Sequence, residues 1–367
     1  MLKALVDRAK GLTVGDSGHK AAMYDLFPKV DKAVDGDDCD RDCGSCTIQY
    51  PKNFRVDESD DLYGLVKGWS THVLVATGKT DWVHDVAHED GSVMQAIASA
   101  KPPTNGPLRL SASDMPTPHG TSSYAEPTTV LLLPALVLVD NVTPAAVPTL
   151  LESVVSRAPT TASPLEPFSL PRSLPLPAPH ADHVLTTRRC HHRAVILLCA
   201  HKTRDARCGQ SAPLLRKEFR RHLEPRGLYR DPDDERPGGV GIYFVSHLGG
   251  HGYSANVLVY RRGGNWEEED DDARAKAKAE AKAESQEGEA QKGEGEGRAD
   301  KSGENGGQEE KGVGDGDVGA SQCIWLARVR PEHCEGIVKF TVMQGKVVKP
   351  EKQLRGGFDR GKGLLSW

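Results

Sequence analysis

The sequence predicts an α/β protein made of two similar units in tandem. Continuous apolar runs, such as AVILLC at 194–199, are typical of strands buried on both faces. Helix-forming segments separate these runs, and the pattern VLVATGKTD at 73–81 returns faintly as ILLCAHKTR at 196–204. A chain of 367 residues is long enough for about two domains and some unstructured segments.

In the second unit, the expected elements follow one another from residue 194 to residue 343. Ser211 is suited to cap a helix and Pro213 to lie in its first turn, so we expect the first helix to begin there. The order strand, helix, three strands, helix fits a reduced thioredoxin-like fold, whose last two strands form a hairpin. The expected elements are strands at 194–199, 241–246, 253–260 and 323–329, and helices at 211–222 and 331–343.

The first unit shows the same pattern less clearly. Residues 137–144 (VLVDNVTP) parallel residues 324–331 (IWLARVRP), and Ala76 stands where the second unit has Cys199. The expected divisions are an N-terminal segment (1–37), a degenerate thioredoxin-like domain (38–157), a Pro-rich linker (158–182), a second thioredoxin-like domain (183–350) and a C-terminal tail (351–367).

Three stretches resemble spacers in composition. Residues 101–127 are rich in Pro, Ser and Thr, and residues 158–182 alternate Pro with Leu, Ser and Ala, which predicts surface loops or linkers. Residues 263–321 consist mostly of Glu, Asp, Lys, Ala and Gly and cannot bury enough apolar surface to offset the entropy of ordering. We expect a disordered acidic insertion there, in a hairpin loop whose extra length costs little.

Composition argues against several classes of function. The formal net charge of −5 indicates neither nucleic-acid binding nor a polybasic membrane surface. The most apolar stretch, 129–139, contains Pro134 and is shorter than the roughly 20 residues that span a bilayer. Residues 1–12 lack the Ser and Arg content of a mitochondrial presequence, so we expect a cytoplasmic rather than a mitochondrial protein.

The eight cysteines are clustered, which indicates metal or redox chemistry rather than a disulfide scaffold. Cys199 ends the first strand of the second unit, and Cys208 is expected in the loop before the first helix. His247 ends the second strand, and a Leu-Gly-Gly turn brings His251 back beside it. All four side chains are therefore expected at one end of the sheet, where the loops converge.

Two thiolates and two imidazoles suit either zinc or an iron–sulfur cluster. Zinc fingers usually space their cysteines two to four residues apart, so the longer gap here fits a dinuclear cluster more easily. Cys199 and His201 form half of a Rieske motif (C-x-H), but Ser211 stands where the other half needs a histidine. The sequence is therefore not that of a Rieske protein.

The same region resembles the sucrase/ferredoxin-like family, the actin-patches-distal group of bishistidinyl thioredoxin-like ferredoxins. The resemblance rests on residues 198–219 (LCAHKTRDARCGQSAPLLRKEF) and 245–260 (VSHLGGHGYSANVLVY), with further similarity at 46–85 and 323–339. It implies a ferredoxin domain with a 2Fe–2S cluster. The implied ligands are Cys199 and Cys208 on one iron, and His247 and His251 on the other.

The implied ligand set also suggests a mechanism. Two ferric ions, two sulfides, two thiolates and two neutral imidazoles sum to zero charge, and a less negative cluster accepts an electron more readily. Reduction would then favour proton uptake at the imidazoles. We expect proton-coupled one-electron transfer or redox sensing, with a donor and an acceptor that the sequence does not identify. No nucleophile–base pair is visible, so the sequence favours an electron-transfer protein over a catalyst.

The sequence also allows predictions for residues beside the ligand loop and for other cysteines. His201 and Arg207 flank the ligand loop, where each either tunes the cluster by hydrogen bonding or serves as an ordinary loop residue. Cys190 lies in a basic, histidine-rich stretch and is expected at the surface. Cys323 and Cys334 lie among apolar residues and are expected in the core.

Cys39, Cys43 and Cys46 form a third cysteine group (CDRDCGSC). Its C-x-x-C can be a redox pair or half of a zinc site, but no second pair of ligands is close in the sequence. Two alternative functions remain open on this basis. One is a thiol–disulfide oxidoreductase that uses Cys43 and Cys46, and the other is a zinc-stabilised interaction module without redox activity.

The chain ends in Leu365, Ser366 and Trp367 after a Gly-rich stretch. The terminal tryptophan has no obvious packing partner, so we expect it to be exposed. The tripeptide resembles the C-terminal signal by which client proteins engage the cytosolic iron–sulfur targeting machinery. On that resemblance it would be a maturation signal, which agrees with a cytoplasmic location.

Overall fold

The structure is a computed structural model in which residues 20–264, 266 and 316–367 are described. The strands of this part of the chain form one mixed sheet. Along the sheet they are β13 (Leu364–Leu365), β12 (Leu354–Asp359), β11 (Gln322–Leu326), β10 (Val257–Arg261), β7 (Ala194–Cys199), β9 (Val240–Val245), β2 (Leu108–Ser113), β1 (Thr71–Ala76), β3 (Thr128–Leu133), β4 (Val137–Val142), β6 (Val184–Arg189) and β5 (Ser173–Pro175), with β8 (Tyr229–Arg230) beside β9.

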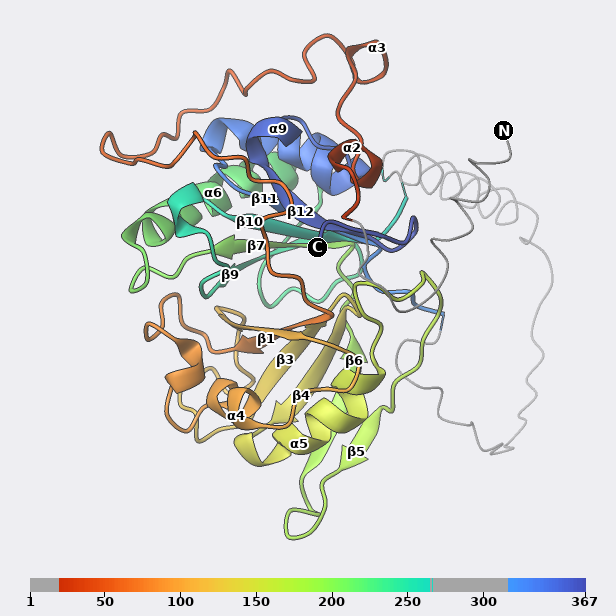
Figure 1. Cartoon of the computed structure of the whole chain (residues 1–367). Coiled ribbons are helices and arrows are strands. Elements are labelled where there is room, and N and C mark those ends of the chain that lie inside the picture. Colours follow the sequence, from red (N-terminus) through yellow and green to blue (C-terminus); the bar gives the residue numbers. More distant parts are fainter. Residues whose placement is uncertain (1–19, 265, 267–315) are drawn as a thin grey trace, which may run out of the picture.

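Most of the helical segments are short, and together with the mixed sheet they confirm the predicted α/β class. The helical segments are α2 (Met23–Leu26), α3 (Lys32–Asp35), η2 (Val86–His88), α4 (Val93–Ser99), η3 (Pro144–Ala146), α5 (Val147–Thr149), η4 (Leu150–Val154), η5 (Val155–Arg157), α6 (Ala206–Leu223), η6 (Glu224–Arg226), η7 (His251–Tyr253), η8 (Pro331–His333), α8 (Cys334–Gly336), η9 (Ile337–Val342) and α9 (Pro350–Gln353). Figure 1 shows two halves, one with α4 and α5 and the other with α6 and α9, and the C-terminus between them.

Both halves of the sheet repeat one pairing pattern. In the first half, β1 pairs parallel with β2 and antiparallel with β3, which pairs antiparallel with β4. In the second half, β7 pairs parallel with β9 and antiparallel with β10, which pairs antiparallel with β11. The halves join where Ser113 of β2 pairs with Val245 of β9. The repeat inferred from the sequence has this counterpart in strand pairing, while the thioredoxin-like character of each unit stays a prediction.

The central strands are apolar because both of their faces are covered. Every residue of β7 and β9 is buried, as the continuous apolar runs predict. Helix α6 packs on this half of the sheet with Leu215 and Phe219, both fully buried. Full burial of such a side chain stabilises the fold by roughly 1.5–3 kcal/mol. This packing fixes the ends of β7 and β9, where the predicted ligands lie.

Helix α6 begins earlier in the chain than predicted. We expected Ser211 as its N-cap, but the Asp205 side chain caps the helix by accepting a 2.8 Å hydrogen bond from the backbone N–H of Arg207. Pro213 therefore lies inside the helix rather than in its first turn. Cys208 consequently lies in the first turn of α6, so its predicted place in a preceding loop is wrong.

Three stretches that we expected to be loops or tails contribute strands. Residues 101–127 contain β2, residues 158–182 contain β5, and the predicted tail 351–367 contains β12 and β13. Glycine content concealed β12 in the sequence. Gly357 has a φ of 149°, and a Cβ there would lie 1.9 Å from the carbonyl oxygen of Cys323, so glycine is required for β12 to pair with β11.

The acidic insertion predicted at 263–321 lies mostly outside the described residues, as do residues 1–19. Both of its ends are described, and both pack against the sheet because they continue β10 and β11. Trp266 is fully buried, and the Asp317 carboxylate forms an ion pair with Arg262. The insertion is thus shorter than predicted at each end. Within the described ranges, no helix has the length and apolar character needed to cross a membrane.

Candidate functional site

The ends of two parallel strands bring Cys199 and His247 together. Cys199 is the last residue of β7, and it pairs with Val245, the last residue of β9. Because parallel strands end at the same edge of a sheet, the segment after Val245 passes beside Cys199. The side chain of His247 interacts there with the Cys199 thiol.

Cys208 reaches the same place from the first turn of α6. Its Sγ lies 3.4 Å from the Sγ of Cys199, and both cysteines are buried and free. Two sulfurs on one tetrahedral metal ion lie roughly 3.8 Å apart when each bond is about 2.3 Å. In a disulfide they would lie about 2.05 Å apart. The pair therefore has nearly the spacing of two ligands on one metal ion.

The surroundings favour a thiolate at Cys199. The hydrogen bond with Cys208, the His247 side chain and the backbone N–H of Leu248 lower the pKa of Cys199, although burial opposes them. The same hydrogen bond and burial raise the pKa of Cys208, whose Sγ also lies 3.7 Å from Oγ of Ser254. Metal binding by both sulfurs would release the remaining proton.

His201 orients the loop that carries His247. Its Nδ1 accepts a 3.2 Å hydrogen bond from the backbone N–H of His247, and its Nε2 donates to the carbonyl oxygen of Trp82 at 3.1 Å. The two bonds together select the neutral tautomer, and burial lowers the pKa of His201. His201 therefore acts on His247 through the backbone.

Two glycines make the turn between the predicted histidine ligands. Gly249 and Gly250 have φ values of 86° and 66°, a region that residues with a Cβ rarely adopt. His251 follows as the first residue of η7. The side chain of His251 lies outside the described part of the structure.

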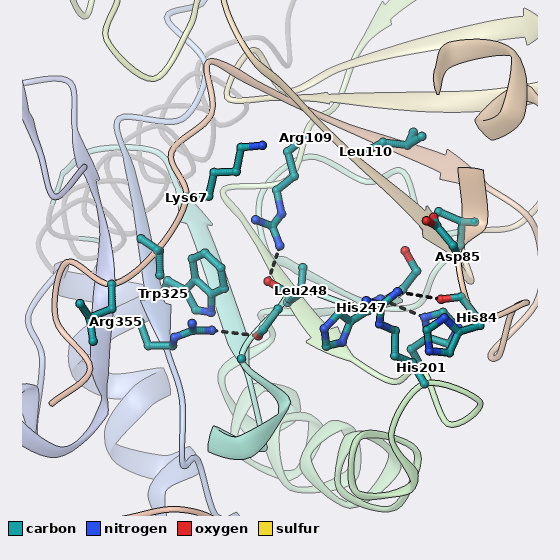
Figure 2. Close-up of a pocket in the computed structure, with 17 residues that line it drawn as sticks. Lys67, His84, Asp85, Arg109, Leu110, His201, His247, Leu248, Trp325 and Arg355 are labelled. Atoms are coloured by element: carbon teal, nitrogen blue, oxygen red, sulfur yellow. Dashed lines mark hydrogen bonds between the residues drawn. The ribbon is translucent and has the colours of Figure 1, made fainter. Parts of the chain in front are cut away.

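Arg109, which is partly buried, and Arg355, which is buried, hold this turn, as Figure 2 shows. Arg109 donates a 2.5 Å hydrogen bond to the carbonyl of Leu248, and Arg355 donates one of 2.9 Å to the carbonyl of Gly249. Both guanidinium groups lie over the ring of Trp325, at 4.8 and 4.4 Å. Burial lowers the pKa of Arg109 and lowers that of Arg355 to about 10. Among the described residues, no carboxylate contributes to the pKa shift of either arginine.

A cavity of about 450 Å³ opens beside His247 (Figure 2). Asp85 is the one acidic side chain among its lining residues, so the potential inside is positive. The cavity gives water and small anions access to His247, which lies beside the thiol pair. Its basic residues are Lys67, His84, Arg109, His201, Arg204, His247 and Arg355.

Arg207 contacts the helix cap rather than the thiols. Its Nε and Nη2 donate to the Asp205 carboxylate at 3.0 and 2.7 Å, and Nη1 donates to the carbonyl of Arg55 at 3.1 Å. The Arg207 charge and Cys208 still interact electrostatically. Arg207 thus holds the cap of the helix that carries Cys208.

Of the remaining cysteines, Cys190 is not at the surface. It is buried in an apolar cluster with Tyr243, because the residues after β6 turn inward to enter β7. Its predicted surface position is therefore wrong. Cys323 and Cys334 are fully buried, which confirms their predicted place in the core.

The C-terminal tripeptide is packed into the fold, so its predicted exposure is wrong. The Ser366 hydroxyl is buried and accepts a 2.8 Å hydrogen bond from the backbone N–H of Gly357. Leu365 belongs to β13, and the ring of Trp367 stacks on that of Trp69 with centroids 4.5 Å apart. The aromatic partner that the sequence did not reveal is Trp69, which lies in the other half of the chain.

A second group of metal-ligating side chains lies farther along α6. Cys43, Glu218 and His222 are buried, and their ligand atoms lie within 4.8 Å of one another. Glu218 and His222 are four residues apart and share one face of the helix. The spacing of Glu218 and His222 within the predicted helix is the sequence signal for this group, but it is neither a pair of neighbouring cysteines nor a pair of histidines. The group could hold a metal ion.

The chain matches known proteins over much of its length. Residues 62–356 match the sucrase/ferredoxin-like family. Actin patches distal protein 1 of Saccharomyces cerevisiae is 29% identical over 261 residues, which cover 65% of this chain and 76% of that protein. Altered inheritance of mitochondria protein 32 of Clavispora lusitaniae is 26% identical over 158 residues, 43% of this chain and 33% of that protein. The protein of the same name from Debaryomyces hansenii is 44% identical over 66 residues, 18% of this chain and 20% of that protein. No solved structure matches the chain.

Proposed function

Because this chain belongs to the sucrase/ferredoxin-like family, we propose that it binds a 2Fe–2S cluster and serves as a one-electron carrier or redox sensor. The observation that carries the proposal is the 3.4 Å separation of two buried, free thiols beside a histidine. The proposed ligands are Cys199, Cys208, His247 and His251. A bound cluster of this kind supplies reversible one-electron transfer.

The charges around the site support a potential above that of ferredoxins with four cysteine ligands. Two thiolates and two neutral imidazoles leave the oxidised site without net charge. Arg109 and Arg355 bring two further positive charges to the loop beside it, in a buried setting where electrostatic interactions are stronger than in water. Both arginines would therefore stabilise the reduced state.

The basic cavity supports coupling of the electron to a proton. His247 lines the cavity, so a proton from water could reach its ring. Proton uptake there on reduction would compensate for the added negative charge. The potential would then fall as the pH rises, by at most about 59 mV per pH unit for a one-electron couple.

The C-terminal tripeptide has a proposed role in insertion of the cluster. Leu365, Ser366 and Trp367 would engage the cytosolic iron–sulfur targeting machinery while they are detached from β12 and Trp69, before the cluster is inserted. Cluster insertion would then precede docking of the tail. This route implies a cytoplasmic location, although two relatives carry mitochondria in their names.

Iron and acid-labile sulfide analysis of the anaerobically purified protein tests the proposal. We expect about two of each per chain, with visible charge-transfer absorption, and loss of both in Cys199→Ser and Cys208→Ser. Cys190→Ser is the matched control, because this buried cysteine lies outside the site. A colourless, iron-free protein would contradict the proposal and leave the two alternatives, a thiol–disulfide oxidoreductase at Cys43 and Cys46 or a zinc-stabilised interaction module.

A further inference from the structure

The C-x-x-C of the amino-terminal segment packs against the carboxyl-terminal part of α6. The backbone N–H of Cys43 donates a 2.9 Å hydrogen bond to the carbonyl of Glu332, which ties the cysteine loop to η8. The Cys43 thiol faces Glu218 and His222 on α6, and the Cys46 thiol interacts with the same Glu218 carboxylate. We propose that Cys43, Cys46, Glu218 and His222 bind a zinc ion that fastens this segment to α6.

Arg221 marks the position of a cation in this group. Its Nη2 lies 2.5 Å from Oε1 of Glu218, 3.1 Å from Nε2 of His222 and 3.4 Å from Sγ of Cys43. Oε1 of Glu218 and Nε2 of His222 also lie 3.2 Å from each other, so the ligand atoms of these two residues and of Cys43 converge on one point. A metal ion accepts all three lone pairs. The Arg221 side chain is 41% exposed, so it can withdraw toward solvent when the ion binds.

The Glu218 carboxylate is the strongest sign that a ligand is needed. Glu218 is fully buried, and its Oε2 has no hydrogen-bond partner among the described residues. A buried charge is costly unless it is paired or coordinates a metal. Arg221 satisfies Oε1 only. Coordination of a metal ion by Glu218 would give its Oε2 the partner that it otherwise lacks.

The donor set selects zinc among the common ions. Mg²⁺ and Ca²⁺ take oxygen ligands and do not prefer thiolates, whereas sulfur, imidazole and carboxylate together suit Zn²⁺ with four ligands. Two thiolates, one carboxylate and Zn²⁺ leave one negative charge, which the Arg221 guanidinium offsets from outside the ligand shell. Cys39 is not part of the site, because it packs with Val30 and Phe340 in a separate apolar cluster.

The zinc site is independent of the proposed iron–sulfur site. Cys208 and Glu218 lie ten residues apart on α6, which corresponds to about 15 Å along the helix. The segment that the zinc ion would fasten continues to Leu65, Val66 and Lys67, which line the basic cavity. Zinc would therefore hold one wall of that cavity in place without touching its chemistry.

Metal analysis of the full-length protein, expressed with iron and zinc in the medium, tests the proposal. We expect about one zinc per chain in the wild type and at least a tenfold loss of zinc in Cys43→Ser and in His222→Ala. Cys39→Ser is the matched control in the same loop, and it should keep its zinc. Cys199→Ser should also keep its zinc while it loses iron.

X-ray absorption at the zinc edge of the wild type gives a second readout that does not depend on how the variants fold. A first shell of two sulfurs and two nitrogen or oxygen atoms supports the site. A wild type without zinc, a Cys43–Cys46 disulfide in its place, or zinc retained in both ligand variants would overturn it. Zinc that disappears in Cys199→Ser instead would place the ion at the thiol pair, and would overturn both this site and the iron–sulfur proposal.

Discussion

Arg355 fills the space that a side chain on residue 250 would occupy. A Cβ on Gly250 would lie 2.5 Å from Nη2 of Arg355, and Gly250 also has a φ of 66°. The same arginine donates a hydrogen bond to the carbonyl of Gly249. The turn between the two proposed histidine ligands is thus shaped by a residue that is remote in the sequence.

Gly250→Ala should therefore damage both the fold and the site. The positive φ costs an alanine about 1 kcal/mol, and the displacement of Arg355 adds to this. We expect a lower free energy of unfolding in urea and less iron bound per chain. Gly252→Ala is the matched control, because a Cβ there meets no atom within 4 Å and its φ is not positive. Equal behaviour of the two variants would show that the contact with Arg355 does not matter.

Ser254→Ala should lower the reduction potential. The Ser254 hydroxyl lies 3.7 Å from Sγ of Cys208, and hydrogen bonds to ligating sulfurs raise the potential of a cluster. A hydrogen bond worth about 1 kcal/mol corresponds to about 40 mV for one electron. A redox titration monitored by visible absorption measures the shift. Ser254→Thr keeps the hydroxyl and should titrate close to the wild type, and a potential that rises in Ser254→Ala would contradict the prediction.

Trp367→Ala should destabilise the protein, because the Trp367 ring stacks on Trp69 and meets Phe358 edge-on. The side chain is only partly buried, so we expect a loss of about 2 kcal/mol in the free energy of unfolding, below the range for fully buried tryptophans. Urea unfolding measures this loss. Val34→Ala, at a side chain that is 76% exposed, should change little. An unchanged stability in Trp367→Ala would mean that the tail is detached in solution and free for a partner.

His192→Gln should flatten the dependence of stability on pH. Burial lowers the pKa of His192 to about 4, whereas a histidine in an unfolded chain has a pKa of about 6.5. Between these values the unfolded chain binds a proton that the folded chain does not. The free energy of unfolding therefore falls as the pH decreases from about 6.5 to 4, by about 2 kcal/mol at pH 5.

Urea unfolding at pH 7 and at pH 5 measures this contribution. Wild type should lose about 2 kcal/mol more than His192→Gln between the two values, since glutamine does not titrate and can keep a hydrogen bond to Tyr243. The neighbouring His191 is exposed, so His191→Gln should behave like the wild type. The same loss of stability in all three proteins would exclude His192 as the cause.

The sequence was most informative where burial alone determines structure. The run AVILLC gave the bounds of β7, because a strand covered on both faces has no polar positions. It was least informative where glycine and proline enter strands. β12 contains Gly356 and Gly357, which the close approach of Ser366 and Cys323 requires, and composition alone makes such a segment resemble a loop.

In the candidate site, too, some residues could be placed from the sequence and others could not. Cys199 and His247 could be placed together from strand ends, since parallel strands finish at one edge. Arg109 and Arg355 could not, because they come from β2 and β12 and no spacing links them to the histidine loop. Only the tertiary pairing of strands brings such residues into contact.

The position of α6 had the largest consequence for the site. Asp205 and Ser211 are both residue types that cap helices, and in the structure Asp205 is the cap. That choice puts Cys208 on a rigid helix rather than on a loop. It also fixes the relation of Cys208 to Glu218 and His222 on the same helix.

Electron paramagnetic resonance of the reduced, anaerobically purified protein tests the histidine-ligated 2Fe–2S cluster most directly. We predict a rhombic signal in the wild type that changes in both His247→Cys and His251→Cys, because the added electron would reside on the iron that the proposed histidine ligands bind. A signal that is the same in all three proteins would show that these histidines are not ligands. A wild type without any signal, with zinc bound at Cys199 and Cys208, would contradict the cluster itself.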